Sequence, residues 1–431
     1  MRLNKPSVRR AVAVAATALA LLCSACSVTG GESNKGAAGS GSGTINVLLM
    51  KQAGYSEDDV AKMVSSFEEE NPKIKVKTTF VAYEALHDKI VTSAAAGTYD
   101  VVLLDVIWPA ELASKGLIAD VSDRFPESWE QDMLGGALNT AEYKDKYYGV
   151  PWYPSTKLFF YNTAMLDKVG GAPDDLKTWD GVLAVARKVK DAGVKYPIAW
   201  SWAQAEALIC DYAQLLGAFG GEFTDDDGNL VINNKQGVQA LTWMKKTVDE
   251  GLTNPASTTF LEDDVSKSMA QGDTAFSLNW ESTFRDLNDK SISKVAGDVG
   301  VAATPAGPTG ERPGVNGAMA LSIAARSKNQ DAAWKFIEHA TSKENQEQFV
   351  KSSAPVWKAS YDKPKVLDVN RPVFEASKVA FESSILRPQI VNYNGVSQAI
   401  QVQLQNALLG KKTPQKALDD AVAAANDMLA E

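Results

Sequence analysis

A carboxylate and an indole ring follow a single apolar run in the stretch YDVVLLDVIWPAELASKGL, residues 99–117. The run VVLL predicts a strand buried on both faces, and it leads into Asp105, with Trp108 three residues further on. A carboxylate at a strand end can accept hydrogen bonds from hydroxyl groups, and an aromatic ring offers a flat apolar surface. The pair is therefore suited to holding a neutral polar molecule. The alternative is that Asp105 caps the helix that begins near Pro109, with Trp108 packed beneath the surface.

Aromatic rings also occur at the ends of other predicted strands. An aromatic face can lie against the C–H face of a pyranose ring, while neighbouring Asp, Glu, Asn and Arg side chains share the hydrogen bonds of its hydroxyls. This pattern favours a site for a neutral sugar. Packing in a core is the alternative for each ring, and it is strongest for Trp200 and Trp243. The other rings lie in the segments VPWYPS, AWSWAQAE and SLNWES and include Trp152, Tyr153, Trp202 and Trp280.

Charge and histidine content argue against several kinds of site. The 431 residues carry a formal net charge of −9, a sign that disfavours binding to nucleic acid. The chain contains only two histidines, His87 and His339, which lie far apart in the sequence. A zinc site or a histidine-based catalytic triad has little to build on, so we expect no metal and no cofactor.

The N-terminal segment predicts export. Basic residues precede a short apolar run at 11–23, which is typical of a secretory signal and shorter than the ~20 residues of a membrane span. Small residues precede Cys26 in LLCSAC, which resembles a bacterial lipobox, although Cys23 stands where an aliphatic residue is usual. We therefore expect a signal peptide over 1–25 and a lipid on Cys26, the alternative being plain secretion after a cut near Ala25.

The residues after Cys26 predict a tether. Residues 26–43 are rich in Gly and Ser and lack a hydrophobic period, which is typical of a flexible coil. A lipid on Cys26 would hold the folded body at the extracytoplasmic face of the membrane. Cys210 would then have no partner, and the helical spacing of EALICDYAQLL predicts that it is buried as a small apolar residue.

The elements that position Asp105 alternate between strand and helix. Strands are predicted at 45–50, 74–80 and 101–104, with a helix capped by Ser56 and a second helix at 84–96 between them. This order predicts a parallel α/β sheet, in which ligands bind beyond the carboxyl ends of the strands. The loop KQAGY, which follows the first strand, lies at that same edge of the sheet. Gln52 and Tyr55 of this loop therefore join Asp105 as candidate binding residues.

A second α/β domain follows. Amphipathic helices are predicted in TWDGVLAVARKVKDAG and KQGVQALTWMKKTVDEG, with strands in LFFYN, PIAW and TAFSLNW. The segment 303–317 is dense in Pro and Gly and indicates a lobe boundary, and AMALSIA after it predicts another buried strand.

Five ordered segments together resemble the family 1 extracellular solute-binding proteins of sugar ABC transporters, in particular the trehalose/maltose and multiple-sugar branch. The resemblance spans about 44 to 431. The segments are GTYDVVLLDVIWPAELASKGLIADVSD, YGVPWYPSTKLFFYNTAMLDKVGGAPDDLKTWDGVLAVARKV, GDTAFSLNW, ALSIAARSKNQDAAWKFIEHATSKENQEQF and RPQIVNYNGVSQAIQVQLQNALLGKKTPQKALDD.

The resemblance implies a two-lobe periplasmic-binding-protein fold of type II, similar to maltose-binding protein, with a ligand cleft between the lobes. It implies a monomeric, non-catalytic receptor that delivers a di- or oligosaccharide to a membrane permease. The expected lobes are residues 44–151 with 301–354, and residues 152–300 with 355–431.

The resemblance also implies roles for individual residues. Departures from the family pattern at Ser155, where an acid is common, and at Gly317-Ala318, where a Gly-Trp pair is common, argue against copying a trehalose or maltose specificity. Xylobiose-like or cellobiose-like ligands stay open. The residues that match family positions are Asp105 and Glu206 as acids, Tyr153 and Trp280 as rings, Arg387 as a hydroxyl-binding arginine, and Gly317 at the rim.

Two other functions are compatible with the residues alone. An exported glycosidase would need two carboxylates about 5 to 10 Å apart, for which Asp105 and Glu206 are candidates. A binding protein for peptides or organic acids would use Arg387 to hold a carboxylate.

Overall fold

The computed structural model describes residues 42–51, 54–225 and 227–429. The predicted signal peptide, Cys26, most of the tether and Gln52 lie outside these described residues. Within the described part of the chain, no helix is long and apolar enough to cross a membrane.

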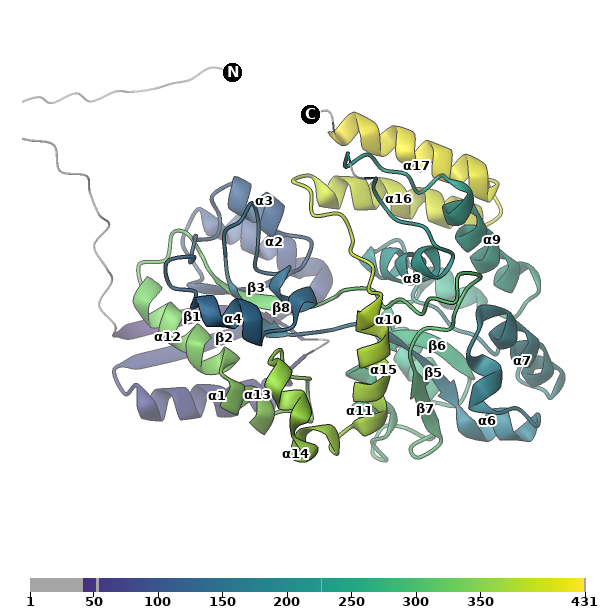
Figure 1. The fold of residues 1–431 in the computed structure, drawn as a ribbon, viewed down its shortest axis with the longest axis horizontal. Helices are drawn as coiled ribbons and strands as arrows, with labels where there is room; N and C mark the ends of the chain where they lie inside the picture. Colours follow the sequence, from purple (N-terminus) through teal and green to yellow (C-terminus); the bar gives the residue numbers. More distant parts are fainter. Residues whose placement is uncertain (1–41, 52–53, 226, 430–431) are drawn as a thin grey trace, which may run out of the picture. The chain divides into compact units, whose positions relative to one another are not determined.

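A five-stranded sheet forms the centre of the first lobe, with strand order β2-β1-β3-β8-β4 (Figure 1). β1 pairs in parallel with β2 and β3, which agrees with the predicted parallel arrangement of the first three strands. β8 is antiparallel to both β3 and β4, so the complete sheet is mixed. The strands are β1 (Gly43–Met50), β2 (Ile74–Val81), β3 (Val101–Asp105), β4 (Val150–Tyr153) and β8 (Met319–Ile323).

Helices pack on this first sheet around an apolar core. The side chain of Ser56 accepts a hydrogen bond from the backbone N–H of Asp59 and caps α1, as predicted, and α1 buries Val60, Met63 and Phe67. The helices of this lobe are α1 (Glu57–Glu70), α2 (Tyr83–Ala94), α3 (Pro109–Ser114), α4 (Glu127–Asp132), α5 (Gly135–Leu138), α12 (Gln330–Thr341), α13 (Lys343–Gln348), the 3-10 helix η3 (Lys358–Asp362) and α14 (Pro364–Leu367).

A three-stranded antiparallel sheet, with order β6-β5-β7, forms the second lobe together with a larger set of helices. The strands are β5 (Lys157–Asn162), β6 (Phe276–Trp280) and β7 (Val299–Ala302). The helices are α6 (Thr163–Lys168), η1 (Pro173–Leu176), α7 (Trp179–Asp191), α8 (Glu206–Ala218), α9 (Lys235–Asp249), η2 (Pro255–Thr259), α10 (Glu262–Ala270), α11 (Thr283–Leu287), α15 (Arg371–Glu382), α16 (Tyr393–Leu408) and α17 (Pro414–Leu429).

The predicted strand PIAW is not a strand in the structure. Ile198 forms only isolated bridges, with Thr253 and with Phe276. Pro197 has no N–H to donate, and its carbonyl accepts from the backbone of Ala275 and Phe276 instead. The segment therefore lies beside the sheet without becoming one of its named strands.

The chain returns to the first lobe later than residue 301. The Pro- and Gly-rich segment 303–315 packs along the second lobe: Gln214 donates to Thr304 over 2.6 Å, and Val315 lies in the second apolar core. Ala318 lies in the first core, so the crossing falls between Val315 and Ala318. The lobe boundary that the sequence predicts near residue 301 is therefore too early in the chain. The Pro and Gly content of this segment indicated a boundary, but the segment packs as part of the second lobe.

The last crossing also comes later than expected. Val356 and Trp357 pack in the first core, whereas the sequence predicts that residues 355–431 belong to the second lobe. α15 packs against β7 of the second sheet, so the chain crosses between Trp357 and Arg371.

Candidate functional site

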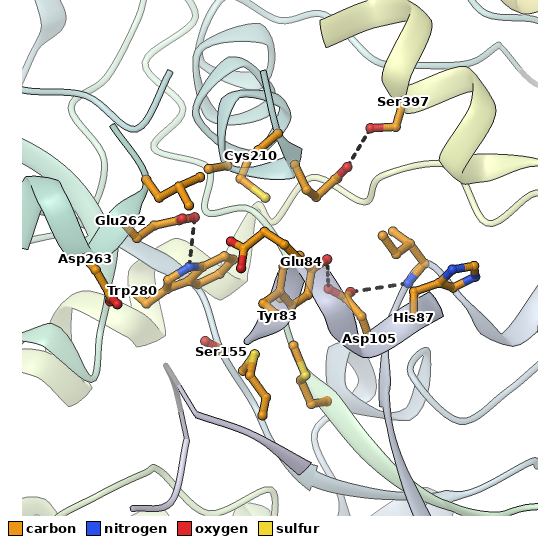
Figure 2. A pocket seen from close by; sticks show the side chains of 18 of the residues that line it. Tyr83, Glu84, His87, Asp105, Ser155, Cys210, Glu262, Asp263, Trp280 and Ser397 are labelled. Carbon is orange, nitrogen blue, oxygen red and sulfur yellow. Dashed lines mark hydrogen bonds between the residues drawn. The ribbon is translucent and has the colours of Figure 1, made fainter. Parts of the chain in front are cut away.

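A cavity of about 660 Å³ lies between the two lobes. Its walls come from the carboxyl ends of β3 and β4 and the start of α2 in the first lobe, and from the starts of α8 and α10 and the end of β6 in the second. This volume is in the range of about 300–1,000 Å³ that is typical of small-molecule sites. Figure 2 shows Glu262, Asp263 and Trp280 on one side and Tyr83, Asp105 and His87 towards the other.

Asp105 is the acid of the first wall and is where the sequence places it, at the end of a buried strand. It is only 3% exposed. The hydroxyl of Tyr83 donates to Asp105 Oδ2 over 2.7 Å, and Arg387 Nη2 donates to Oδ1 over 3.0 Å. Burial and the neighbouring carboxylate raise the pKa of Tyr83, so its hydroxyl stays protonated as a donor.

Trp108 lies behind Tyr83. The two rings are stacked with their centroids 5.8 Å apart and an interplanar angle of 16°, and the ring of His87 lies 5.4 Å from that of Trp108. Trp108 touches the cavity but is 2% exposed, whereas Tyr83 is half-buried. The aromatic surface that the first lobe offers a ligand therefore belongs mainly to Tyr83.

Sequence reasoning missed Tyr83, although a signal for it exists. It is the first residue of α2 and comes shortly after the end of β2. β2 is parallel to β1, and β1 is parallel to β3, so the ends of β2 and β3 face the same edge of the sheet. The rule that ligands meet the carboxyl ends of parallel strands selects this position as well as that of Asp105.

Trp280 is the ring of the second wall. It ends β6, lines the cavity and donates through Nε1 to Glu262 Oε1 over 3.3 Å. A Cβ atom at Gly317 would come within 2.3 Å of the indole, so only glycine allows this close approach. Gly317 also lines the cavity, and its N–H donates to Ser155 O over 2.9 Å, which joins two of the chain crossings.

Arg387 connects the walls. Its Nη1 donates to Glu206 Oε1 over 2.9 Å and its Nη2 to Asp105 Oδ1 over 3.0 Å, so one buried guanidinium holds an acid from each lobe. Nη2 also donates to the carbonyl of Asn316. Ser397 donates to the other oxygen of Glu206 over 2.6 Å. Burial raises the pKa of Glu206 even though Arg387 and Ser397 favour its ionised form.

Tyr153 reaches the cavity with a phenol that is almost fully buried. Its hydroxyl has no hydrogen-bond partner in the described part of the chain. The hydroxyl is itself buried and lies close to Gly54, where a Cβ atom would come within 2.9 Å of it, so it is the ring of Tyr153 that contributes to the cavity lining.

Two predicted residues lie elsewhere. Tyr55 packs against Trp152 and Tyr153, with ring centroids 5.0 and 5.9 Å away, and does not line the cavity. Trp202 is fully buried in the second core, stacked on Trp200 at 5.1 Å, and does not reach the cavity either. Aromatic density alone does not separate a core stack from a binding wall.

Cys210 is buried, as its helical spacing predicts, and is one of the residues that line the cavity. Burial raises the pKa of its thiol to about 12, which keeps the thiol neutral. Among the described residues no group of three or more metal-ligating side chains occurs.

The cavity is rich in acids. Its described lining residues include one arginine, Arg387, and one lysine, Lys267. Both terminal nitrogens of Arg387 already bind carboxylates. This excess of negative charge disfavours an anionic ligand. The acidic lining residues are Glu84, Asp88, Asp105, Glu206, Glu262, Asp263 and Asp264.

Comparison with known proteins agrees with the geometry. The family model described as bacterial extracellular solute-binding protein matches residues 50–347. A probable ABC transporter-binding protein of Deinococcus radiodurans is 29% identical over 75% of this chain and 79% of its own length.

Solved structures share the whole two-lobe architecture. Maltose-bound MalE3 of T. maritima superposes with a TM-score of 0.83 at 29% identity, covering 90% of this chain and all of that one. A solute-binding protein of an ABC transporter from Thermotoga lettingae, bound with alpha-D-tagatose, superposes with a TM-score of 0.82 at 27% identity, with coverage of 90% and 100%.

Proposed function

The chain belongs to the family 1 bacterial extracellular solute-binding proteins of ABC transporters, and we propose that it captures a di- or oligosaccharide and delivers it to a membrane permease. Its architecture confirms the predicted two-lobe, maltose-binding-protein-like fold of type II. Members of this family bind substrates and are not enzymes, and the family is extracytoplasmic. The cargo, the anchoring and the delivery are the proposal.

One observation carries the proposal: each wall of the cavity offers an aromatic ring beside a carboxylate. Tyr83 stands beside Asp105, and Trp280 stands beside Glu262. Rings suit the C–H faces of pyranoses, and carboxylates accept from sugar hydroxyls. Because the two pairs come from different lobes, a sugar that contacts both would stabilise the closed arrangement of the lobes.

Further contacts are assigned to residues that line the same cavity. The carboxylate of Glu206, which already accepts from Arg387, Tyr393 and Ser397, is assigned as a further acceptor for sugar hydroxyls, and Arg387 orients the two acids between which it lies. Gly317 leaves room for the indole of Trp280. The maltose bound to MalE3 and the tagatose bound to the T. lettingae protein support a carbohydrate as the class of ligand.

Anchoring rests on the sequence. The signal-like segment 1–25 and Cys26 support export followed by lipidation, with 26–43 as the tether at the outer face of the membrane. We expect a monomer. Mass spectrometry of the membrane fraction from the producing bacterium would detect a diacylglyceryl group on Cys26, and its absence there would contradict the anchor.

The alternative functions have less support. A ligand carboxylate would have to compete with Asp105 and Glu206 for Arg387, inside an acidic cavity. A glycosidase would need a free pair of carboxylates, whereas these two are bound to one guanidinium.

A binding screen tests the proposal. The purified protein would be melted with disaccharides, trisaccharides, sugar acids, amino acids and dipeptides, because a ligand at a hundredfold excess over its Kd stabilises the fold by about 2.7 kcal/mol. A neutral saccharide should raise the melting temperature, and the shift should be lost in Asp105→Asn. A shift with dipeptides or organic acids only would overturn the proposed cargo, and cleavage of the saccharide on long incubation would favour a glycosidase.

A further inference from the structure

A buried lysine lies behind the second wall. Lys157 is the first residue of β5, and its side chain is completely buried, yet it is absent from the described lining of the cavity. Its ammonium lies 2.8 Å from Asp211 Oδ1 and 3.1 Å from Glu262 Oε1. It also donates to Ser201 Oγ over 2.9 Å. A charged lysine is seldom found in such a position unless it is paired.

This lysine contacts both functional groups of the wall. The register of β5 and β6 places Lys157 opposite Trp280, and its Nζ lies 5.4 Å from the centroid of the indole ring. Glu262 accepts from Trp280 Nε1 and is also paired with Lys157. Ring, carboxylate and ammonium therefore form a closed triangle of contacts.

The ammonium keeps its charge in this setting. Burial alone would lower the pKa of Lys157, but Asp211 and Glu262 raise it above its ordinary value. Asp211 is held in turn by Ser201, whose hydroxyl donates to Oδ2 over 3.1 Å. Asp211 provides the buried counter-charge, which leaves the contacts to Trp280 and Glu262 as the ones that reach the cavity.

We propose that Lys157 is a positioning residue for ligand binding, which fixes the ring of Trp280 and the carboxylate of Glu262 without itself touching the ligand. The proposal rests on the proposed function of the cavity. A cation beneath an aromatic face is attracted by the ring quadrupole most strongly where water is excluded, so the charge holds the ring flat. An apolar side chain of similar length would fill the space but would not hold Glu262.

The test removes the charge without leaving a buried acid unpaired. Lys157→Met alone strands Asp211 and risks unfolding, so the variant is the double substitution Lys157→Met/Asp211→Asn. We expect sugar affinity, measured by calorimetry with the saccharide found in the melting screen, to fall about tenfold. In a background that lacks both targets, Trp280→Ala/Glu262→Gln, the same double substitution should change affinity less than about twofold, because neither group is left to be positioned. Equal losses in both backgrounds would overturn the proposal.

A ligand-free measurement separates this inference from the proposed function. Acrylamide quenching of the Trp280 emission, taken as the difference between each protein and its Trp280→Phe counterpart, should increase when Lys157 and Asp211 are neutralised. Unchanged quenching would overturn the positioning role even if sugars bind. Increased quenching in a protein that binds no sugar would support the positioning of the ring and refute the cargo.

A matched control uses an ion pair outside the site. Lys245 and Asp249 of α9 are 2.6 Å apart and do not line the cavity. Lys245→Met/Asp249→Asn carries the same chemical changes and should leave affinity and quenching unaltered. A tenfold loss of affinity in this control would show that the effect is not specific to Lys157.

Discussion

The two walls of the cavity present the same pair of groups but hold the ring in different ways. In the first lobe Tyr83 rests on another ring, Trp108, and donates to Asp105. In the second lobe Trp280 rests on the ammonium of Lys157 and donates to Glu262. The first ring is held by apolar packing, and the second by a buried network of charges.

This difference predicts which changes each wall tolerates. Aromatic stacking has little dependence on salt or protonation, so the support that Trp108 gives to the Tyr83 ring should depend on shape, while the hydrogen bond to Asp105 is a separate polar contribution. A buried ion network fails when one member is removed, because the partner is left unpaired. Arg387 belongs to both walls, since it binds Asp105 and Glu206, and its removal should do the most damage.

The largest effect is expected for Arg387→Met, which tests the connection between the walls. The buried Asp105 and the largely buried Glu206 would lose their shared cation, and breaking a buried ion pair costs about 3–5 kcal/mol. Urea unfolding should therefore show a loss of that size in the free energy of unfolding. Arg187 binds Glu250 at an exposed position, and Arg187→Met should cost less than about 1 kcal/mol. Similar losses in both variants would mean that Arg387 does not join the walls.

The crossing between the walls contains an acid without a cation. Glu281 accepts from Ser155 Oγ over 2.9 Å and from the N–H of Thr156 over 3.1 Å, and it forms no ion pair with any described residue. Burial raises the pKa of Glu281 to about 7, in spite of these two hydrogen bonds. The phenols of Tyr153 and Tyr361 lie near it.

The second prediction concerns the pH dependence that Glu281 gives to stability. Between about pH 4.5 and pH 7 the folded protein binds more protons than the unfolded chain, so the free energy of unfolding falls as the pH rises, by up to about 3 kcal/mol. Glu281→Gln should remove that part of the slope in urea unfolding at pH 5 and pH 8. Glu222→Gln, at an exposed position, should keep it. An unchanged slope in Glu281→Gln would show that Glu281 is not the group that titrates.

The third prediction separates the second wall from the core behind it. Trp280→Ala removes the partly buried ring that lines the cavity and should weaken sugar binding by about 2 kcal/mol, roughly thirtyfold, as for other central aromatic contacts. Trp202→Phe changes a ring in the core stack and should leave affinity within about twofold, at some cost in stability. Calorimetry of both variants measures the contrast. A large loss of affinity in Trp202→Phe would restore Trp202 to the site.

Much of the first wall could be predicted because its logic is local. The sequence predicts a buried strand, an acid at its carboxyl end and a parallel neighbouring strand, each from a short stretch of residues. Asp105 lies where these features predict. The covering of Trp108 by Tyr83 depends on how α2 docks, which brings together residues far apart in sequence. The rule for strand ends finds both positions but cannot tell which ring lies in front.

The second wall could be predicted only in part. The ring of Trp280 follows from its place at the end of a strand and from the family resemblance. The burial of Lys157, just before LFFYN, could not be predicted from its neighbours in the sequence. The acids that permit its burial, Asp211 and Glu262, come from separate helices far along the chain. Trp202 shows the opposite error, since a run of aromatics predicted a binding surface where the fold builds a core.

The smallest effect is expected in the first wall and sharpens the contrast with the second. Tyr83→Phe keeps the stacked ring but removes the donor to Asp105, which should cost about 1 kcal/mol of binding, or roughly fivefold in Kd. Trp108→Phe keeps a ring beneath Tyr83 and should change Kd less than about twofold, while lowering the melting temperature. If Trp108→Phe weakens binding more than Tyr83→Phe does, then Trp108 is the ring that meets the ligand, and the first wall is arranged like the second.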